Sequence, residues 1–198
     1  NRTCSGKIVN ARIRAAQGEV IRCAQRFQVL AAGRRFGKTH VGNLELVRAA
    51  CGRGRKVWYV APTYNQAKRI VWTRLKELAR SFGRIEISET DLRIQMPWDA
   101  TIEVRGADNY DALRGEGRDF VVLDEYADMR PEVWPEVLRS ALSDRSGGAL
   151  FTGTPKGFNH FYELFDKARR EPDWAAFQFT TEQGGNVSAE ELRSASRE

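Results

Sequence analysis

The sequence has few cysteines and few histidines for its length. Its 198 residues include three cysteines and two histidines, and no two cysteines form a Cys-x-x-Cys pair. The odd number and the spacing argue against a disulfide framework and against a structural zinc site. We therefore expect a protein that works in a reducing compartment.

Long apolar runs are missing as well. No run approaches the roughly 18 residues that a membrane span requires, and the first residues lack the apolar core of a signal peptide. These absences predict a soluble protein with no membrane partner. The 41% hydrophobic content and the length instead fit one globular domain with a core of its own.

The charge balance is moderately basic. Lys and Arg number 32 and Asp and Glu number 26, which gives a net charge of +6. The excess is spread along the chain and is not concentrated in a tail. It is therefore compatible with a nucleic-acid partner, although many basic proteins never bind DNA.

Residues 32–39 read Ala-Gly-Arg-Arg-Phe-Gly-Lys-Thr and directly follow an apolar stretch, Phe27 to Ala31. This is the pattern of a phosphate-binding loop between a strand and a helix, with Ala32 where the first glycine usually stands. Small residues let successive backbone N–H groups wrap a polyphosphate, while Lys38 reaches the terminal phosphates and Thr39 ligates Mg²⁺. The alternative is a glycine turn with a surface lysine, which the preceding strand disfavours. The pattern predicts a site for a nucleoside triphosphate.

Apolar periodicity alternates between strands and helices along the chain. Strands are expected at 27–31, 57–61, 120–123, 149–152 and 176–180, with three shorter hairpin strands near 85–87, 92–95 and 101–104. Helices are expected at 10–23, 38–52, 64–82, 131–142 and 159–170. The alternation predicts an α/β fold with a mainly parallel central sheet flanked by helices. A polar segment at 183–186, followed by a short charged helix, is the one candidate linker.

The apolar residues 121–123 are followed by two acids, Asp124 and Glu125. The end of this strand would place Asp124 at the carboxyl edge of the sheet, beside the phosphate loop. There Asp124 can hold Mg²⁺ through water, and Glu125 can polarise the water that attacks the γ-phosphate. Acids at a strand end are common, but this pair follows Lys38 by 86 positions (124 − 38) in the correct order. The order favours a hydrolase.

A third pattern, Thr152-Gly153-Thr154-Pro155, ends the next apolar strand. A small polar residue at this place, Thr154, could sense the γ-phosphate and relay its loss to the following helix. The alternative is an ordinary strand-to-helix turn with Gly and Pro.

With these patterns in this order, the chain resembles the ATPase domain of the large terminase subunit of tailed bacteriophages over about residues 11–195. The Arg-rich phosphate loop, residues 61–67, Leu113-Arg114-Gly115 and residues 152–155 carry the resemblance. It implies a RecA-like P-loop NTPase of the additional-strand (ASCE) type. It also implies that ATP, with Mg²⁺, is hydrolysed to drive double-stranded DNA into a procapsid.

The resemblance also implies roles for single residues. Lys38 and Glu125 would be catalytic, and Arg114 would be an arginine finger in a neighbouring subunit's site, where a guanidinium offsets charge on the transferred phosphoryl group. Gln17 stands where the family has an adenine-contacting glutamine, although Arg-Ala-Ala precedes it in place of the usual His-Pro pattern. The nucleotide-binding set would be Gln17, Gly33, Arg34, Arg35, Gly37, Lys38, Thr39 and Thr154, with Thr39 and Asp124 holding the metal.

Two assignments stay open at this point. Arg114 could instead be a surface arginine beside a tight turn, and Arg34 or Arg35 could make the phosphate contact within the same subunit.

Partners and domain limits follow from the resemblance too. The family acts in the host cytoplasm as a homo-oligomeric ring on a portal protein, together with a small terminase subunit. Its full-length members carry a C-terminal nuclease domain, before which this sequence stops. We therefore expect an ATPase domain at 1–182, the start of a linker at 183–198, and no nuclease activity in this chain.

Two other classes of protein share parts of the pattern. One RecA-like lobe of a superfamily 1 or 2 helicase has the Asp-Glu pair and a small-residue coupling motif, but such an enzyme needs a second lobe. A non-catalytic subunit that binds nucleotide for DNA assembly is disfavoured by the joint presence of Lys38, Thr39, Asp124 and Glu125.

Overall fold

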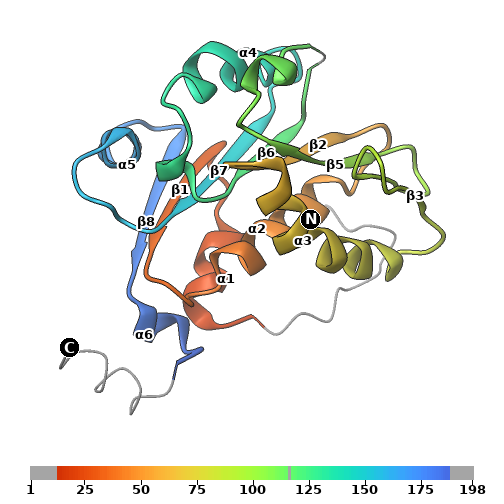
Figure 1. The fold of residues 1–198 in the computed structure, drawn as a ribbon. Coiled ribbons are helices and arrows are strands. Elements are labelled where there is room, and N and C mark those ends of the chain that lie inside the picture. Colours follow the sequence, from red (N-terminus) through yellow and green to blue (C-terminus); the bar gives the residue numbers. More distant parts are fainter. Residues whose placement is uncertain (1–12, 116, 188–198) are drawn as a thin grey trace.

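The computed structural model describes residues 13–115 and 117–187, which form one eight-stranded sheet with helices on both faces (Figure 1). The strand order is β3-β4-β5-β2-β6-β7-β1-β8. In this order, the last six strands, from β5 through to β8, are parallel, and β3 and β4 form an antiparallel edge. The strands are β1 Phe27–Ala32, β2 Lys56–Ala61, β3 Glu86–Ser88, β4 Arg93–Gln95, β5 Thr101–Gly106, β6 Phe120–Leu123, β7 Gly148–Gly153 and β8 Trp174–Phe179.

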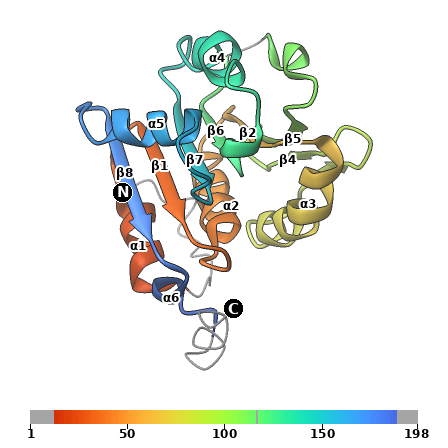
Figure 2. The ribbon, with the colours of Figure 1, turned by 60° about the vertical axis from the view of Figure 1, so that its left-hand side comes forward.

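Helices cover each face of the sheet (Figures 1 and 2). They are α1 Ala15–Arg22, α2 Lys38–Ala49, α3 Tyr64–Arg80, α4 Arg139–Ala141, α5 His160–Ala168 and α6 Thr181–Gly184. Shorter helical turns lie at Tyr110–Leu113, Tyr126–Asp128 and Val133–Leu138. Helices α1, α2 and α3 pack on one face, while α5 and the turns before α4 pack on the other. The central strands are buried on both faces, which is why they read as continuous apolar runs.

Strand β7 lies between β1 and β6. The strand that leads into the phosphate loop is therefore separated from the strand that ends in Asp124 by one additional strand, as predicted. This insertion matters for function, because it brings the end of β7 between the phosphate loop and the acid pair.

Most predicted elements are present, but the helix expected from Pro131 differs. The helical segment begins two residues later, and its first part, Val133–Leu138, has the wider π-helical turn before α4. Pro135 lies inside that segment and has no N–H to give to a carbonyl four residues earlier, so a regular α-helical ladder is broken there. The predicted first helix is present as α1 but begins at Ala15; residues 13 and 14 are not helical, and residues 10–12 lie outside the described range. The charged helix expected after residue 186 falls mainly on residues outside that range as well.

The cysteines and the tryptophans differ in their roles in the fold. Cys23 is a free thiol, but Cys51, just after α2, is disulfide-bonded. Three cysteines cannot all be paired with one another, but two of them can still form one disulfide bond. All five tryptophans are buried in, or packed against, the two cores: Trp58, Trp72, Trp98, Trp134 and Trp174.

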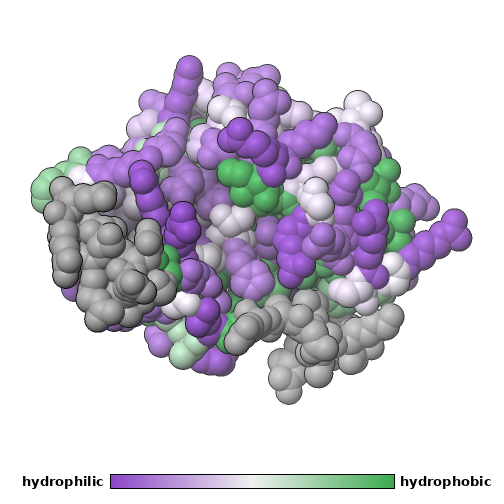
Figure 3. Space-filling model, turned by 60° about the horizontal axis from the view of Figure 1, so that its bottom comes forward, coloured by the Kyte–Doolittle hydropathy of each residue, from purple (hydrophilic) through white to green (hydrophobic). Residues whose placement is uncertain are grey.

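The surface seen from below Figure 1 is mainly hydrophilic, with scattered apolar side chains (Figure 3). Among the described residues, no helix has the length and apolar character that crossing a membrane requires.

Candidate functional site

The phosphate loop connects the end of β1 to the start of α2. Gly37, its last residue before the helix, has φ 96°, in the left-handed region that favours glycine. The first residues of α2 direct their backbone N–H groups toward the loop, and a helix N-terminus is a natural site for phosphate. Lys38 is nearly buried, and its Nζ donates to the carbonyls of Ala32 at 3.1 Å and Gly33 at 3.4 Å.

The acid pair lies at the end of β6, across β7 from the loop. Thr39 Oγ1 donates to Asp124 Oδ2 at 3.1 Å. Glu125 has a left-handed backbone, φ 52°, and its carboxylate accepts from the backbone N–H of Thr154 at 3.3 Å. Its Oε1 lies 3.7 Å from Lys38 Nζ, and its side chain is 29% exposed, so water can reach it. Lys38 also contacts Thr154 Oγ1 at 2.9 Å.

The structure thus brings five of the predicted site residues together: Lys38, Thr39, Asp124, Glu125 and Thr154. They come from three segments that follow the neighbouring strands β1, β6 and β7. Their joint position is a direct result of the inserted strand β7.

The oxygen ligands in this cluster fit Mg²⁺. A hydroxyl and a carboxylate oxygen stand together, and both are ligand types that Mg²⁺ takes in nucleotide sites. Within residues 13–115 and 117–187, no group of three or more His, Cys, Asp and Glu side chains could form an all-protein metal cage. A nucleotide-dependent Mg²⁺ site needs no such cage, because phosphates and water supply the other ligands. Thr39 and Asp124 are therefore the residues that would hold the ion.

Two hydroxyl groups outside the predicted set also bind Asp124. Tyr59 donates to Oδ2 and Thr152 donates to Oδ1. Burial, and then the charge of Asp124, raises the pKa of Tyr59 well above its ordinary value, so its hydroxyl is a donor at any physiological pH. Thr152 belongs to the predicted Thr-Gly-Thr-Pro pattern but had no role assigned to it, and Tyr59 lies in a run that looked purely apolar.

Segments from both ends of the described chain hold the outer side of the loop. The carbonyl of Phe36 accepts from Gln17 Nε2 at 3.0 Å and from Asn186 Nδ2 at 3.2 Å. Gln17 also accepts from the backbone of Arg14 at 3.1 Å, so its amide is engaged with protein groups. Its predicted adenine contact stays a prediction. Gly184 packs so closely that a Cβ there would lie 2.5 Å from Phe36 Cα.

The predicted linker is thus in contact with the phosphate loop as far as Asn186. The boundary near residue 183 stays a prediction.

The arginines differ in their placement. Arg34 and Arg35 are exposed on the phosphate loop. Arg114 follows the turn Tyr110–Leu113 and is 56% exposed, with its Nε 3.0 Å from Asp111 Oδ1 of the same turn. This ion pair is made within its own turn and not with the Lys38 cluster, and its role as a finger stays a prediction.

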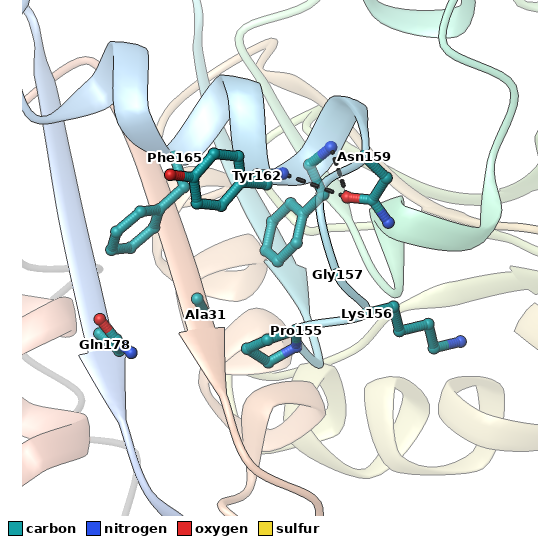
Figure 4. A pocket seen from close by; sticks show the side chains of 9 residues that line it. Ala31, Pro155, Lys156, Gly157, Asn159, Tyr162, Phe165 and Gln178 are labelled. Atoms are coloured by element: carbon teal, nitrogen blue, oxygen red, sulfur yellow. Dashed lines mark hydrogen bonds between the residues drawn. The ribbon is translucent and has the colours of Figure 1, made fainter.

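A small pocket of about 110 Å³ lies beside the loop that follows β7 (Figure 4). Pro155 and Lys156 border it below, and Tyr162 and Phe165 of α5 border it above in that view. Nucleotide-sized ligands need roughly 300 Å³ or more, and the pocket lacks the acid pair. The phosphate chemistry therefore belongs to the Lys38 cluster.

We expect Gly37→Ala to weaken ATP binding and to lower the free energy of unfolding by more than about 1 kcal/mol. An added Cβ would be strained at φ 96° and would lie 2.6 Å from Gln17 Nε2. Gly54→Ala is the matched control, because Gly54 also has a positive φ, 67°, but faces open space. Calorimetric melting should show a lower stability in both variants, because both glycines have a positive φ. ATP titration should show weaker binding in Gly37→Ala alone. Equal ATP affinity in the two variants would contradict the expectation.

Comparisons with known proteins agree with the geometry of this site. A family model described as "Terminase large subunit, T4likevirus-type, N-terminal" matches residues 29–197. The large terminase subunit of Thermus virus P23-45 is 38% identical over 158 residues, covering 70% of this chain and 33% of that protein. The large terminase subunit of Escherichia phage T5 is 27% identical over 182 residues, covering 87% of this chain and 40% of that protein. The chain thus spans about a third of the first of these relatives and two fifths of the second.

Solved structures share the fold. The large terminase ATPase domain of Thermus phage P74-26 superposes with a TM-score of 0.75 at 30% identity, covering 85% of this chain and 81% of that one. The large terminase of another thermophilic bacteriophage, solved in complex with ADP, gives a TM-score of 0.79 at 20% identity, covering 94% of this chain and 50% of that one.

Proposed function

Because the chain belongs to the large terminase subunit family, we propose that it is the ATP-hydrolysing unit of a motor that drives double-stranded DNA into a viral procapsid. The thermophilic bacteriophage terminase that was solved with ADP has also been solved with ATP-gamma-S, which supports ATP as the nucleotide here.

One observation carries this proposal: a lysine, an acid pair and a threonine converge at the ends of three neighbouring strands. Lys38 Nζ lies within 3.7 Å of Glu125 Oε1 and 2.9 Å of Thr154 Oγ1. Asp124 accepts a hydrogen bond from Thr39 at the start of α2. A phosphate at the N-terminus of α2 would therefore meet a cation, a metal-binding pair and a carboxylate suited to activating water.

Each residue then has a defined task. The backbone N–H groups from Gly33 to Thr39 hold the phosphates, and Lys38 offsets their charge. Mg²⁺, when bound with the nucleotide, neutralises charge that develops on the phosphate oxygens. Glu125 orients the attacking water and accepts its proton, because its side chain is partly exposed to solvent and its carboxylate lies 3.7 Å from Lys38 Nζ.

Thr154 couples the state of the nucleotide to the rest of the domain. Its hydroxyl and its N–H bind Lys38 and Glu125, the two side chains that would flank the γ-phosphate. A bound γ-phosphate competes with Thr154 for Lys38, so binding and loss of phosphate change the contacts at the end of β7. The loop after β7 carries this change to α5.

The partners of the whole protein belong to the proposal as well. We infer a homo-oligomeric ring on a portal protein, acting with a small terminase subunit on double-stranded DNA in the host cytoplasm. The net charge of +6 is compatible with the DNA partner.

We expect Lys38→Ala to abolish measurable ATP binding, because it removes the charge that faces the terminal phosphates. Binding is measured by calorimetric titration, and turnover by phosphate release with and without double-stranded DNA. Lys167→Ala, which removes an exposed lysine from α5, is the control and should keep both properties.

Two results would overturn the proposed function. A wild-type chain that binds no ATP would do so, and so would a Lys38→Ala chain that turns over ATP at the wild-type rate. A chain that binds ATP through Lys38 but never releases phosphate, with or without DNA, would favour a non-catalytic assembly subunit.

A further inference from the structure

Tyr59 is a polar residue in the middle of the core. It lies on β2, is fully buried, and stands between the apolar residues Trp58 and Val60. Its register partner on β6 is Val122, two residues before Asp124, so Tyr59 and Asp124 point to the same face of the sheet. The length of the phenol side chain spans the two-residue offset, and its hydroxyl donates to Asp124 Oδ2.

Helix α2 lies close above this part of the sheet. A Cβ at Gly42 would come within 3.0 Å of Val122 Cγ1 and 3.9 Å of the Tyr59 ring. The absence of a side chain at Gly42 therefore lets α2 pack over the ring and limits the directions the hydroxyl can take. Burial in apolar surroundings makes an unmade hydrogen bond costly, which keeps the hydroxyl on its acceptor.

The carboxylate of Asp124 is held by three hydroxyl groups. Thr39 and Tyr59 donate to Oδ2, and Thr152 donates to Oδ1. A carboxylate offers about four acceptor positions. The three donors therefore fix its plane and leave one position on Oδ1 for a water or another ligand.

We propose that Tyr59 is a positioning residue for metal binding, whose hydroxyl holds the Asp124 carboxylate in the orientation that binds Mg²⁺ together with Thr39. This inference rests on the proposed binding of ATP. Outer partners of metal ligands orient them, and their removal commonly costs about 10- to 100-fold in metal affinity. A phenylalanine would fill the same core volume without the hydroxyl, so packing alone does not account for a tyrosine here.

The test compares ATP affinity with and without the metal. ATP dissociation constants are measured by fluorescence titration in EDTA and in excess Mg²⁺, and the constant in EDTA divided by the constant in Mg²⁺ reports the contribution of the metal. Tyr59→Phe should lower this ratio by about 10-fold while the affinity in EDTA stays within about twofold of the wild type. A purely structural role would instead weaken binding by the same factor in both conditions.

Tyr126→Phe is the matched control. Tyr126 is also buried and packs against Phe151 and Phe161, and its ring contacts make no use of the hydroxyl. The ratio of ATP dissociation constants for Tyr126→Phe should equal that of the wild type. Thr152→Val, which removes the donor to Oδ1 at nearly constant volume, should lower the ratio in the same direction as Tyr59→Phe.

Failure of the proposed function and failure of the role of Tyr59 give different results. A wild-type chain that binds no ATP overturns the proposed function, and the role of Tyr59 with it. A wild-type chain with Mg²⁺-dependent affinity and an unchanged ratio in Tyr59→Phe overturns the role of Tyr59 alone. If a melting curve shows that Tyr59→Phe does not fold, a fluorinated tyrosine at position 59 keeps the ring and alters the donor strength. An unchanged ratio there overturns the proposal equally.

Discussion

Mixing Arg114→Ala subunits with Glu125→Ala subunits should restore ATP turnover that neither variant shows alone. Arg114 is 56% exposed on a turn that follows β5, and it pairs with Asp111 of that turn, which is itself exposed. An exposed pair of this kind contributes little to stability and is easily given up. Arg114 is therefore available to a neighbouring subunit's site, and each variant would lack a different half of that site.

The expected size of the effect is large. Loss of an arginine finger lowers turnover by about 10³- to 10⁵-fold, so Arg114→Ala should bind ATP and hydrolyse it at a near-background rate. Arg130→Ala is the control, because Arg130 is an exposed arginine close to the same turn, over the ring of Tyr110. Turnover is measured by phosphate release, and co-assembly by light scattering. Mixtures that co-assemble without regaining activity would contradict action between subunits and make Arg34 or Arg35 the next candidates.

Glu125→Ala should keep ATP binding and lower turnover by at least about 10²-fold, the scale for loss of a general base. The carboxylate lies 3.7 Å from Lys38 and accepts from the N–H of Thr154, so it is held at the edge where the γ-phosphate would lie. Asp128→Ala removes a carboxylate three residues further on, whose partner is the exposed Lys156, and serves as the control. Phosphate release under saturating ATP is the measurement. Wild-type turnover in Glu125→Ala would show that another group activates the water.

The parts of the site that could be predicted are those formed by short contiguous segments of sequence. The phosphate loop is a run of eight residues, and the acid pair directly follows a buried strand, so both carry their own local pattern. The strands were predictable for the same reason, since a strand buried on both faces is a continuous apolar run.

The parts that could not be predicted depend on which strands are neighbours. Tyr59 reaches Asp124 because β2 pairs with β6 in a register that sets Tyr59 opposite Val122. Nothing local to residues 56–61 indicates that pairing. Asn186 meets the carbonyl of Phe36 across 150 positions of sequence, and a polar glycine-rich segment is typical of a linker. One signal was available for Tyr59, because a hydroxyl in a fully buried strand needs a partner.

The strand order has a consequence for how the protein is made. Strand β1 is the first strand of this sheet to be synthesised, yet its two neighbours, β7 and β8, are the last two strands of the same sheet. Residues 27–32 therefore have no pairing partner while more than half of the domain is translated. The two donors on the Phe36 carbonyl come from the beginning and the end of the described chain. A nascent chain thus gains no stability from ATP until nearly all of the domain has left the ribosome, because a ligand stabilises only a site that has formed.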